Sequence, residues 1–284
     1  MPWLPELFSA PAIERLERNA GRELAAVPYF DGLLTGELDA LLESFAAEPE
    51  VHDPVRGRIR GARPFTDLAQ RTRAWLTERN VEVETVTHVS TDGGNGFEEL
   101  VLHLDGPAGR IALPLTLVAQ RRPDRRIEEI RIYFSSWALS RRHAVRPPLL
   151  QPDPALRLEG IVASYQEALA AGDAEAVLAT FEPDGYAREP AGGEYVHRGQ
   201  AALRSFYELL FSGGGGIPLE HCAAVDDGRV CALEYNVCRW GRSELPPQAG
   251  VAVYERGPSG MLAAARIYDD ADPPVDADRP PDPA

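Results

Sequence analysis

The chain repeats itself, and this internal repeat limits its fold more than any other feature of the sequence. The first copy contains Tyr29, Gly36, Leu42, Phe45 and Asp53-Pro54, and the second contains Tyr165, Gly172, Leu178, Phe181 and Glu189-Pro190. Every residue of the first series lies 136 positions before its counterpart, as positions 29 and 165 do. Near the end of each copy, Arg131-Ile132-Tyr133 matches Arg266-Ile267-Tyr268. An ordered series at a nearly constant offset predicts two copies of one domain in tandem.

Proline-rich segments mark the expected domain boundaries. The stretch 146–154 holds four prolines in nine residues, which excludes a helix interior or a central strand. The stretch 269–284 holds six Asp and five Pro, a composition typical of a disordered acidic tail. We therefore expect an N-terminal extension over 1–22, a first domain over 23–141, a linker over 142–157, a second domain over 158–270 and a tail over 271–284.

Hydrophobic spacing predicts the same order of elements in both copies. In the second copy, Leu158, Ile161, Val162, Tyr165 and Leu169 recur at helical spacing, and Gly172 ends that helix. Two more helices and strands at 217–225, 229–238, 250–255 and 261–268 follow. The first copy places helices near 38–45 and 64–76, and strands at 81–89, 97–104, 111–120 and 127–134. Three helices followed by antiparallel strands predict an α+β fold whose helices close each sheet into a cone with an apolar pocket.

Composition argues against several classes of protein. The formal net charge of −15 over 284 residues argues against a nucleic-acid partner, which clustered Lys and Arg would bind. The three cysteines, Cys222, Cys231 and Cys238, have no metal-ligand spacing, and the six His are scattered. We therefore expect reduced thiols, no metal and no cofactor. The sequence has neither a signal-peptide pattern nor an apolar run of about 18 residues, so we expect a cytoplasmic protein without membrane contact.

Two stretches in each copy resemble the ketosteroid isomerase and SnoaL-like proteins of the nuclear transport factor 2-like superfamily. One is a helix that carries a Tyr and ends in Gly, as in Tyr29 to Gly36 and Tyr165 to Gly172. The other is a short strand with an acidic-Pro pair and a nearby Gly, in 51–57 and 187–193. The resemblance covers nearly the whole of each copy and implies tandem cones, each with three helices packed on a curved antiparallel or mixed sheet. Because the superfamily contains many chemistries and many non-enzymes, the resemblance specifies the fold better than the activity.

The resemblance also implies roles for individual residues. In such isomerases the helix Tyr donates a hydrogen bond to a developing enolate oxygen, and a carboxylate moves a proton between carbons. The donor positions are occupied by Tyr29 and Tyr165, and the proton-carrier positions by Asp53 and Glu189. A second, neutral acid would fall near Thr116 or Val251, neither of which is acidic. The chain therefore departs from the full isomerase pattern.

A second branch of the superfamily, the polyether-forming epoxide hydrolases, implies a pair of carboxylates. One protonates the epoxide oxygen and the other activates the attacking hydroxyl. The candidates are Glu82 and Glu84, which share one strand face, and Glu220 in the second copy. Glu82 or Glu84 would act with Asp53, and Glu220 would act with Glu189. All these residues also have ordinary roles, since acidic-Pro pairs form turns, tyrosines fill cores and strand Glu residues often face solvent.

Three functions stay open at this point. The first is a cofactor-independent acid/base enzyme that isomerises, cyclises or opens an epoxide in an apolar, polyketide- or terpenoid-like metabolite. The second is a non-catalytic module that binds a small molecule or a protein, favoured by the missing second acid. The third is an interaction protein that uses its acidic tail or an exposed sheet. We also expect the two copies to pair within one chain as a pseudo-dimer, alone or in a homo-oligomer. The first copy keeps the strand motif and the second keeps the cleaner helix, so the active copy is left open.

Overall fold

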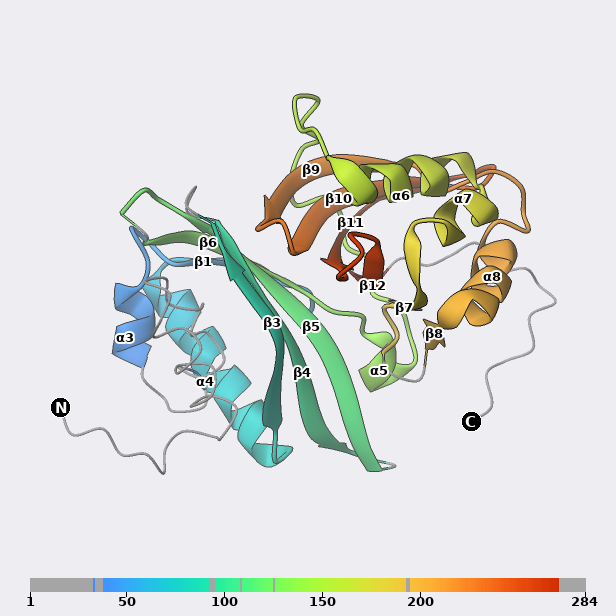
Figure 1. The fold of residues 1–284 in the computed structure, drawn as a ribbon. Coiled ribbons are helices and arrows are strands. Elements are labelled where there is room, and N and C mark those ends of the chain that lie inside the picture. Colours follow the sequence, from blue (N-terminus) through green and yellow to red (C-terminus); the bar gives the residue numbers. More distant parts are fainter. Residues whose placement is uncertain are drawn as a thin grey trace.

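Two α+β domains follow one another along the chain, each built on one six-stranded mixed sheet. The computed structural model describes residues 33, 38–91, 95–107, 109–124, 126–192 and 195–270. The expected N-terminal extension, most of the expected first helix with Tyr29, and the acidic tail lie outside these residues. In Figure 1 the first domain runs from blue to green and the second from yellow to red.

The first domain supplies nine described elements. They are α3 (Leu38–Glu43), β1 (Glu50–Asp53), β2 (Gly57–Arg60), α4 (Ala62–Glu78), β3 (Glu82–Ser90), β4 (Gly96–Gly106), β5 (Gly109–Arg121), β6 (Ile127–Tyr133) and α5 (Trp137–Ser140). The strand order is β2-β1-β6-β5-β4-β3, and only β1 and β6 run parallel. Helix α4 buries Phe65, Leu68 and Leu76 against one face of this sheet.

The second domain repeats this plan. Its elements are α6 (Gly160–Ala171), α7 (Ala174–Leu178), β7 (Phe181–Arg188), β8 (Val196–Arg198), α8 (Gly199–Leu210), β9 (Leu219–Asp226), β10 (Val230–Trp240), β11 (Ser243–Arg256) and β12 (Leu262–Asp269). The order β8-β7-β12-β11-β10-β9 is that of the first sheet, and again one pair, β7 and β12, is parallel. Gly172 ends α6 in the left-handed conformation, and the Asp173 side chain caps α7 through the Ala176 N–H.

Most elements lie where the hydrophobic spacing predicts them, and the main difference is in β11. This strand begins at Ser243 rather than at Gly250. Its early part holds Pro246 and Pro247, which lie where the register with β10 shifts between Val237 and Arg239. Proline has no N–H for a sheet ladder, so it is tolerated at such an irregularity. The segment 243–249 was therefore not predicted as a strand, although its backbone is extended.

The two domains pack against each other through the outer faces of their sheets. A buried apolar cluster joins them, with members from both: Val89, Phe97, Val118, Tyr133, Val225, Val230, Ala232, Ala249, Val251, Val253 and Tyr268. The helices cover the opposite, inner face of each sheet, as Figure 1 shows. Each domain therefore has one core under its helices and shares a third core with its partner.

Two matching sets of buried hydrogen bonds cross this interface. Arg131 on β6 donates to both carboxylate oxygens of Glu234 on β10, at 2.6 and 2.7 Å, and the Tyr133 hydroxyl donates to the same carboxylate at 2.6 Å. Arg266 on β12 donates in the same way to Glu99 on β4, at 2.8 and 2.7 Å. Tyr268 completes that set at 2.7 Å. The repeated Arg-Ile-Tyr motif is therefore the contact by which each copy holds the other.

A third contact ties the end of the second domain to the segment after the first. The buried Asp270 carboxylate accepts hydrogen bonds from the Ser135 hydroxyl, the Ser136 N–H and the Ala144 N–H, at 2.6 to 2.9 Å, and lies 2.9 Å from Nδ1 of His143. Burial alone would raise the pKa of Asp270, but these hydrogen bonds outweigh it and the pKa is lowered. These contacts pair the two copies within one chain, as expected for a pseudo-dimer. Whether the chain is a monomer or a homo-oligomer in solution stays a prediction.

Candidate functional site

A pair of tyrosine hydroxyls lies inside the second domain, beneath α6. Tyr165 on α6 is 2% exposed, and its hydroxyl is 2.9 Å from that of Tyr207 on α8. Burial raises the pKa of Tyr165 to about 12, although the hydrogen bond to Tyr207 lowers it. Burial also raises the pKa of Tyr207 well above its ordinary value. Both groups therefore stay protonated near neutral pH and serve as hydrogen-bond donors.

A second polar chain starts one residue further along α6. The Gln166 side-chain amide donates to the Tyr254 hydroxyl on β11 at 2.7 Å, and its oxygen lies 3.3 Å from Nε2 of His221 on β9. Burial lowers the pKa of His221, so the imidazole is held in its neutral form near pH 7. The Tyr165 and Tyr254 rings are 5.1 Å apart between centroids, so the two polar sets are in contact.

A carboxylate closes this array at the end of β12. The Tyr235 hydroxyl on β10 donates to Asp269 at 2.8 Å, across the backbone of Gly250 on β11. A Cβ on Gly250 would lie 2.6 Å from the Tyr235 ring and 2.9 Å from Cβ of Asp269. The missing side chain at Gly250 is therefore what allows Tyr235 to reach Asp269.

Strand register arranges these groups in rows across the inner face. Tyr254 lies opposite Cys231 and Ala265, and Gly250 lies opposite Tyr235 and Asp269. Ala252 separates the two rows on β11. The second cone therefore holds four buried hydroxyls, one neutral imidazole and one carboxylate around small apolar residues. Such a set can donate to an oxygen and accept a proton, the two actions of acid/base catalysis.

The first cone is lined differently. Its described inner residues are almost all aliphatic or Phe, including Leu100, Leu115, Leu117 and Ala119. The exceptions include Glu98 on β4, which is 0% exposed and lies opposite Leu117 on β5 and His88 on β3. The sequence analysis did not include Glu98 among the candidate carboxylates. The pair Glu98-Glu99 in an apolar strand was the available signal, because adjacent strand residues point to opposite faces and one of the two must face the core.

The predicted carboxylates of the first domain lie elsewhere. Asp53 accepts the N–H groups of Val55 and Arg56, each at 2.8 Å, and so forms the turn between β1 and β2. Glu82 and Glu84 have side chains that are 81% and 59% exposed, and they contact Arg110 and His103. They face away from the cone because Val83 between them belongs to its core. The structure therefore does not bring Glu82 or Glu84 into one cone with Asp53.

The predicted site residues of the second domain also lie in different places. Tyr165 lies in the hydroxyl pair described above, whereas Glu220 is exposed and accepts from the Cys238 thiol at 3.2 Å. Glu189 follows β7 and is 2.7 Å from Nε2 of His197, whose ring stacks on Phe206. The parallel pairing of Arg188 with Arg266 places Glu189 beside Ile267, one row from Asp269.

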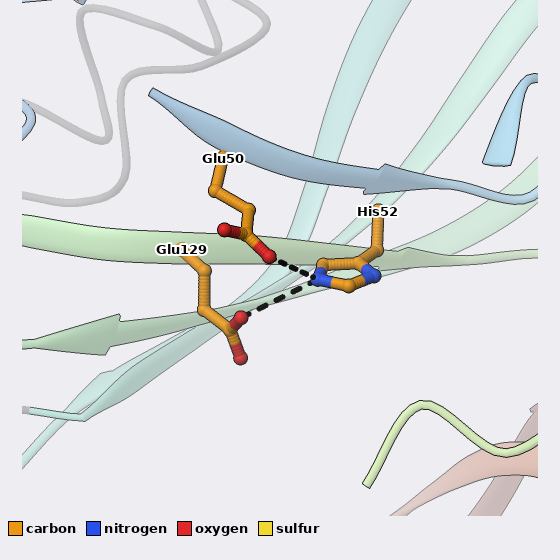
Figure 2. Close-up of side chains that lie close together, drawn as sticks. All are labelled: Glu50, His52 and Glu129. Carbon is orange, nitrogen blue, oxygen red and sulfur yellow. Dashed lines mark hydrogen bonds and ion pairs between the residues drawn. The ribbon is translucent and has the colours of Figure 1, made fainter. Parts of the chain in front are cut away.

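One group of residues has the spacing of metal ligands. Oxygens of Glu50 and Glu129 lie 3.1 and 3.3 Å from Nε2 of His52, on the outer face of the first sheet (Figure 2). Each carboxylate already has a cationic partner, since Arg58 donates to Glu50 at 2.7 Å and Arg131 contacts Glu129. The hydrogen bond to His52 lowers the pKa of Glu129, and that to Arg58 lowers the pKa of Glu50. A metal would have to displace these arginines, so the donor set fits an ion-pair network better than a metal centre.

Comparison with known proteins bears on the second domain. Residues 162–261 match the SnoaL-like domain family, which confirms the resemblance for this copy. A search of curated proteins finds no match. Among the described residues, no helix has the length and apolar character needed to cross a membrane.

Solved structures similar to this chain include the following three proteins. A protein from Sinorhizobium meliloti, provisionally assigned as a polyketide cyclase, is 22% identical, with 39% of this chain and 94% of that chain covered and a TM-score of 0.33. The epoxide hydrolase/cyclase-like enzyme SalBIII of salinomycin formation is 21% identical over 38% and 87%, with a TM-score of 0.33. A protein of unknown function from Cytophaga hutchinsonii, described as NTF2-like, is 14% identical over 41% and 94%, with a TM-score of 0.32.

Proposed function

We propose that the SnoaL-like domain at residues 162–261, together with the adjoining Asp269, binds a small apolar metabolite and moves a proton within it without a cofactor. The observation that carries this proposal is the buried array of Tyr165, Tyr207, Tyr254, Gln166 and His221, with the carboxylate of Asp269 at its edge. An apolar cone with a few convergent polar groups is the usual form of a site for an apolar ligand with one or two oxygens.

In this proposal the hydroxyls and the carboxylate have different roles. The Tyr165 and Tyr207 hydroxyls donate to a substrate carbonyl oxygen and stabilise the negative charge that develops on it. A carboxylate removes a proton from the adjacent carbon, the electron pair moves to the oxygen as an enolate, and the proton returns to a different carbon. Asp269 is the base that the hydrogen-bonded array favours, and Glu189 is the alternative from the neighbouring strand. Isomerisation of an unsaturated ketone is the simplest reaction of this kind, and cyclisation or epoxide opening would use the same groups.

A non-catalytic binding function is the second candidate. It is favoured by the way the tyrosines satisfy one another: Tyr165 packs edge-on to Phe181 at 5.9 Å and lies 6.3 Å from the Tyr207 ring, and their hydroxyls share one hydrogen bond. A self-satisfied network of this kind also gives a rigid core. The two candidates differ in one respect, because only the enzyme needs a carboxylate that exchanges protons with the ligand.

Deuterium exchange of 2-tetralone, a two-ring ketone with easily removed α-hydrogens, tests the proposal. We expect the protein to accelerate exchange in heavy water, followed by NMR, and Tyr165→Phe to slow it by about 10²–10³, the usual effect of removing one oxyanion donor. Asp269→Asn should abolish exchange and leave the affinity for 2-tetralone within about twofold. Tyr195→Phe removes a hydroxyl that accepts a hydrogen bond from Trp137 and is not part of the array. It is the matched control and should behave as wild type.

The outcomes separate the candidates. Loss of exchange in Glu189→Gln instead of Asp269→Asn would move the base to Glu189. Binding of 2-tetralone without accelerated exchange would leave the non-catalytic function, and the absence of binding would overturn both.

A further inference from the structure

The end of strand β12 carries Asp269, and it is paired less fully than the rest of that strand. Pairing of β12 with β7 extends from Leu262 to Arg266, whereas its pairing with β11 continues to Asp269. Among the described residues, the end of the strand therefore has a strand neighbour on one side only. Strand ends held by few contacts open more readily than the middle of a sheet. Further support for Asp269 comes from the next residue, Asp270.

Asp270 is held by four residues that follow β6, and we call this group the clasp: Ser135, Ser136, His143 and Ala144. The buried Asp270 carboxylate accepts the Ser135 hydroxyl at 2.6 Å and the N–H groups of Ser136 and Ala144 at 2.9 and 2.6 Å. Nδ1 of His143 lies 2.9 Å from the same carboxylate. The clasp therefore ties the chain directly after β12 to a segment outside the second domain.

The contact between Ser135 and Asp270 joins equivalent positions of the two copies. The repeated Arg-Ile-Tyr motifs lie 135 positions apart, and the same offset relates Ser135 to Asp270 and Phe134 to Asp269. Equivalent positions meet in this way in the interface of a symmetric dimer. Here one position is a hydroxyl and the other a carboxylate. Because the acceptor is ionised, this hydrogen bond is stronger than one between two neutral groups.

Holding Asp270 also limits where the side chain of Asp269 can lie. Adjacent residues of an extended chain point to opposite sides, so the clasp holds Asp270 while Asp269 points to the inner face. There Tyr235 donates to Asp269 at 2.8 Å. A displacement of about 1 Å in a reacting group can lower a rate by about 10². Movement at Asp270 would therefore change the reaction although Asp270 itself is not part of the array.

We propose that Asp270 is a positioning residue for proton transfer in the second cone, and that the first copy takes part in this reaction through the clasp. This inference rests on the function proposed above, with Asp269 as the base. Asp270 acts by holding Asp269 at the end of β12 and does not itself contact the substrate. The second copy then needs the first for activity as well as for stability, which gives the tandem arrangement a role in the reaction.

Deuterium exchange of 2-tetralone by Asp270→Ala measures this role. We expect the rate at saturating ketone to fall by about tenfold or more, because Asp269 is no longer held in place. KM should stay within about twofold, since Tyr165 and Tyr207, which bind the ketone oxygen in the proposed function, lie on α6 and α8. Asp270→Asn should lose less, because its amide oxygen can still accept the backbone N–H groups of the clasp.

Two further variants show whether the effect passes through the clasp. Ser135→Ala changes the first copy, and it should slow exchange in the second cone by a smaller factor. Added to Asp270→Ala, it should cause no further loss, because the two residues act as one contact. Asp226→Ala is the matched control: Asp226 accepts hydrogen bonds from Gly228 and Arg256 within the second domain, and its loss should leave the rate unchanged.

Amide hydrogen exchange followed by NMR tests the clasp without any ketone. In Asp270→Ala we expect the amides of residues 267–269 to exchange about tenfold faster than in wild type, because the end of β12 opens more often. The amides of α6 should keep their wild-type rates. Asp226→Ala should change neither set.

The outcomes separate this inference from the function on which it rests. Faster amide exchange in Asp270→Ala with an unchanged ketone rate would leave the proposed function and overturn the positioning role. Unchanged amide exchange would overturn it as well. An equal loss of rate in Asp226→Ala would assign the effect to general destabilisation and also contradict it. A wild-type protein that does not accelerate ketone exchange would instead overturn the proposed function and leave Asp270 as a structural residue.

Discussion

The two copies agree on the outer faces of their sheets and differ on the inner ones. Outside, Arg131 and Tyr133 donate to Glu234 as Arg266 and Tyr268 donate to Glu99, with hydrogen bonds of nearly equal length. Inside, three of the four hydroxyls of the second copy correspond to apolar side chains in the first: Tyr207 to Ala69, Tyr235 to Leu100 and Tyr254 to Ala119. The fourth, Tyr165, corresponds to Tyr29 in the sequence. Asp269 is replaced by Phe134, while Leu233 is replaced by the buried Glu98.

This difference shows that the outer faces of the sheets are more constrained in sequence than the inner faces. The outer faces must fit each other, so a change on one side requires a matching change on the other. Among the described residues, the core on the inner face of each sheet has no member from the other copy, so its polarity can change without disturbing that copy. Function that differs between the copies is therefore expected inside the cones, and stability common to both is expected at the interface.

The largest expected effect is at the interface. Glu99→Gln and Glu234→Gln each remove the charge that neutralises a buried arginine, so each should lower the free energy of unfolding by about 3–5 kcal/mol. Urea denaturation followed by circular dichroism measures this. The exposed Glu82→Gln should change it by less than about 0.5 kcal/mol. If only one of the two buried variants were destabilised, the two halves of the interface would not be equivalent.

A smaller effect is expected inside the second cone. Gly250→Ala places a Cβ at 2.6 Å from the Tyr235 ring, so it should displace that ring from Asp269 and destabilise the protein by about 1–3 kcal/mol. The same variant should slow deuterium exchange of 2-tetralone. Gly213→Ala is the control, since a Cβ there meets no atom within 4 Å. Full stability and full exchange in Gly250→Ala would show that the contact between Tyr235 and Asp269 has no role.

The smallest effect concerns pH. Burial holds the pKa of His221 below its ordinary value of about 6.5, so the unfolded chain takes up this proton at a higher pH than the folded protein does. Its contribution to stability is present above about pH 6.5 and decreases as the pH falls through that value. Urea midpoints between pH 7.5 and 5.5 should therefore fall more steeply for wild type than for His221→Gln. Equal slopes would contradict the buried, neutral state of His221.

Much of the architecture could be predicted from the sequence, because it depends on the spacing of apolar residues and on the residues that end helices. Apolar spacing located four of the six strands in each sheet, and Gly172 marked the end of the helix that carries Tyr165. The parallel pairing of β1 with β6 and of β7 with β12 was not predicted, because strand order depends on contacts between distant segments. The expected domain boundaries stay predictions.

The site was harder to predict from the sequence. It depends on which face of each strand meets the cone and on which distant residues lie in contact after folding. Glu82 and Glu84 were correctly placed on one strand face, but which face meets the cone depended on the burial of Val83. Tyr165 was identified from its helix, whereas Tyr207, Tyr254 and Gln166 come from elements that only the folded chain brings together. Adjacent acids in an apolar strand, as at Glu98 and Glu99, are the one local signal that could have been used.

The reciprocal Arg–Tyr–Glu contact has a consequence for how two chains could exchange parts. Each copy carries both halves of the contact, the carboxylate on one strand and the Arg-Ile-Tyr motif on another, so any two copies present complementary faces. What selects the partner within the same chain is the short tether between the copies, which keeps their effective concentration high. At high protein concentration, a first copy from one chain could pair with a second copy from another and form a swapped dimer with the same interface.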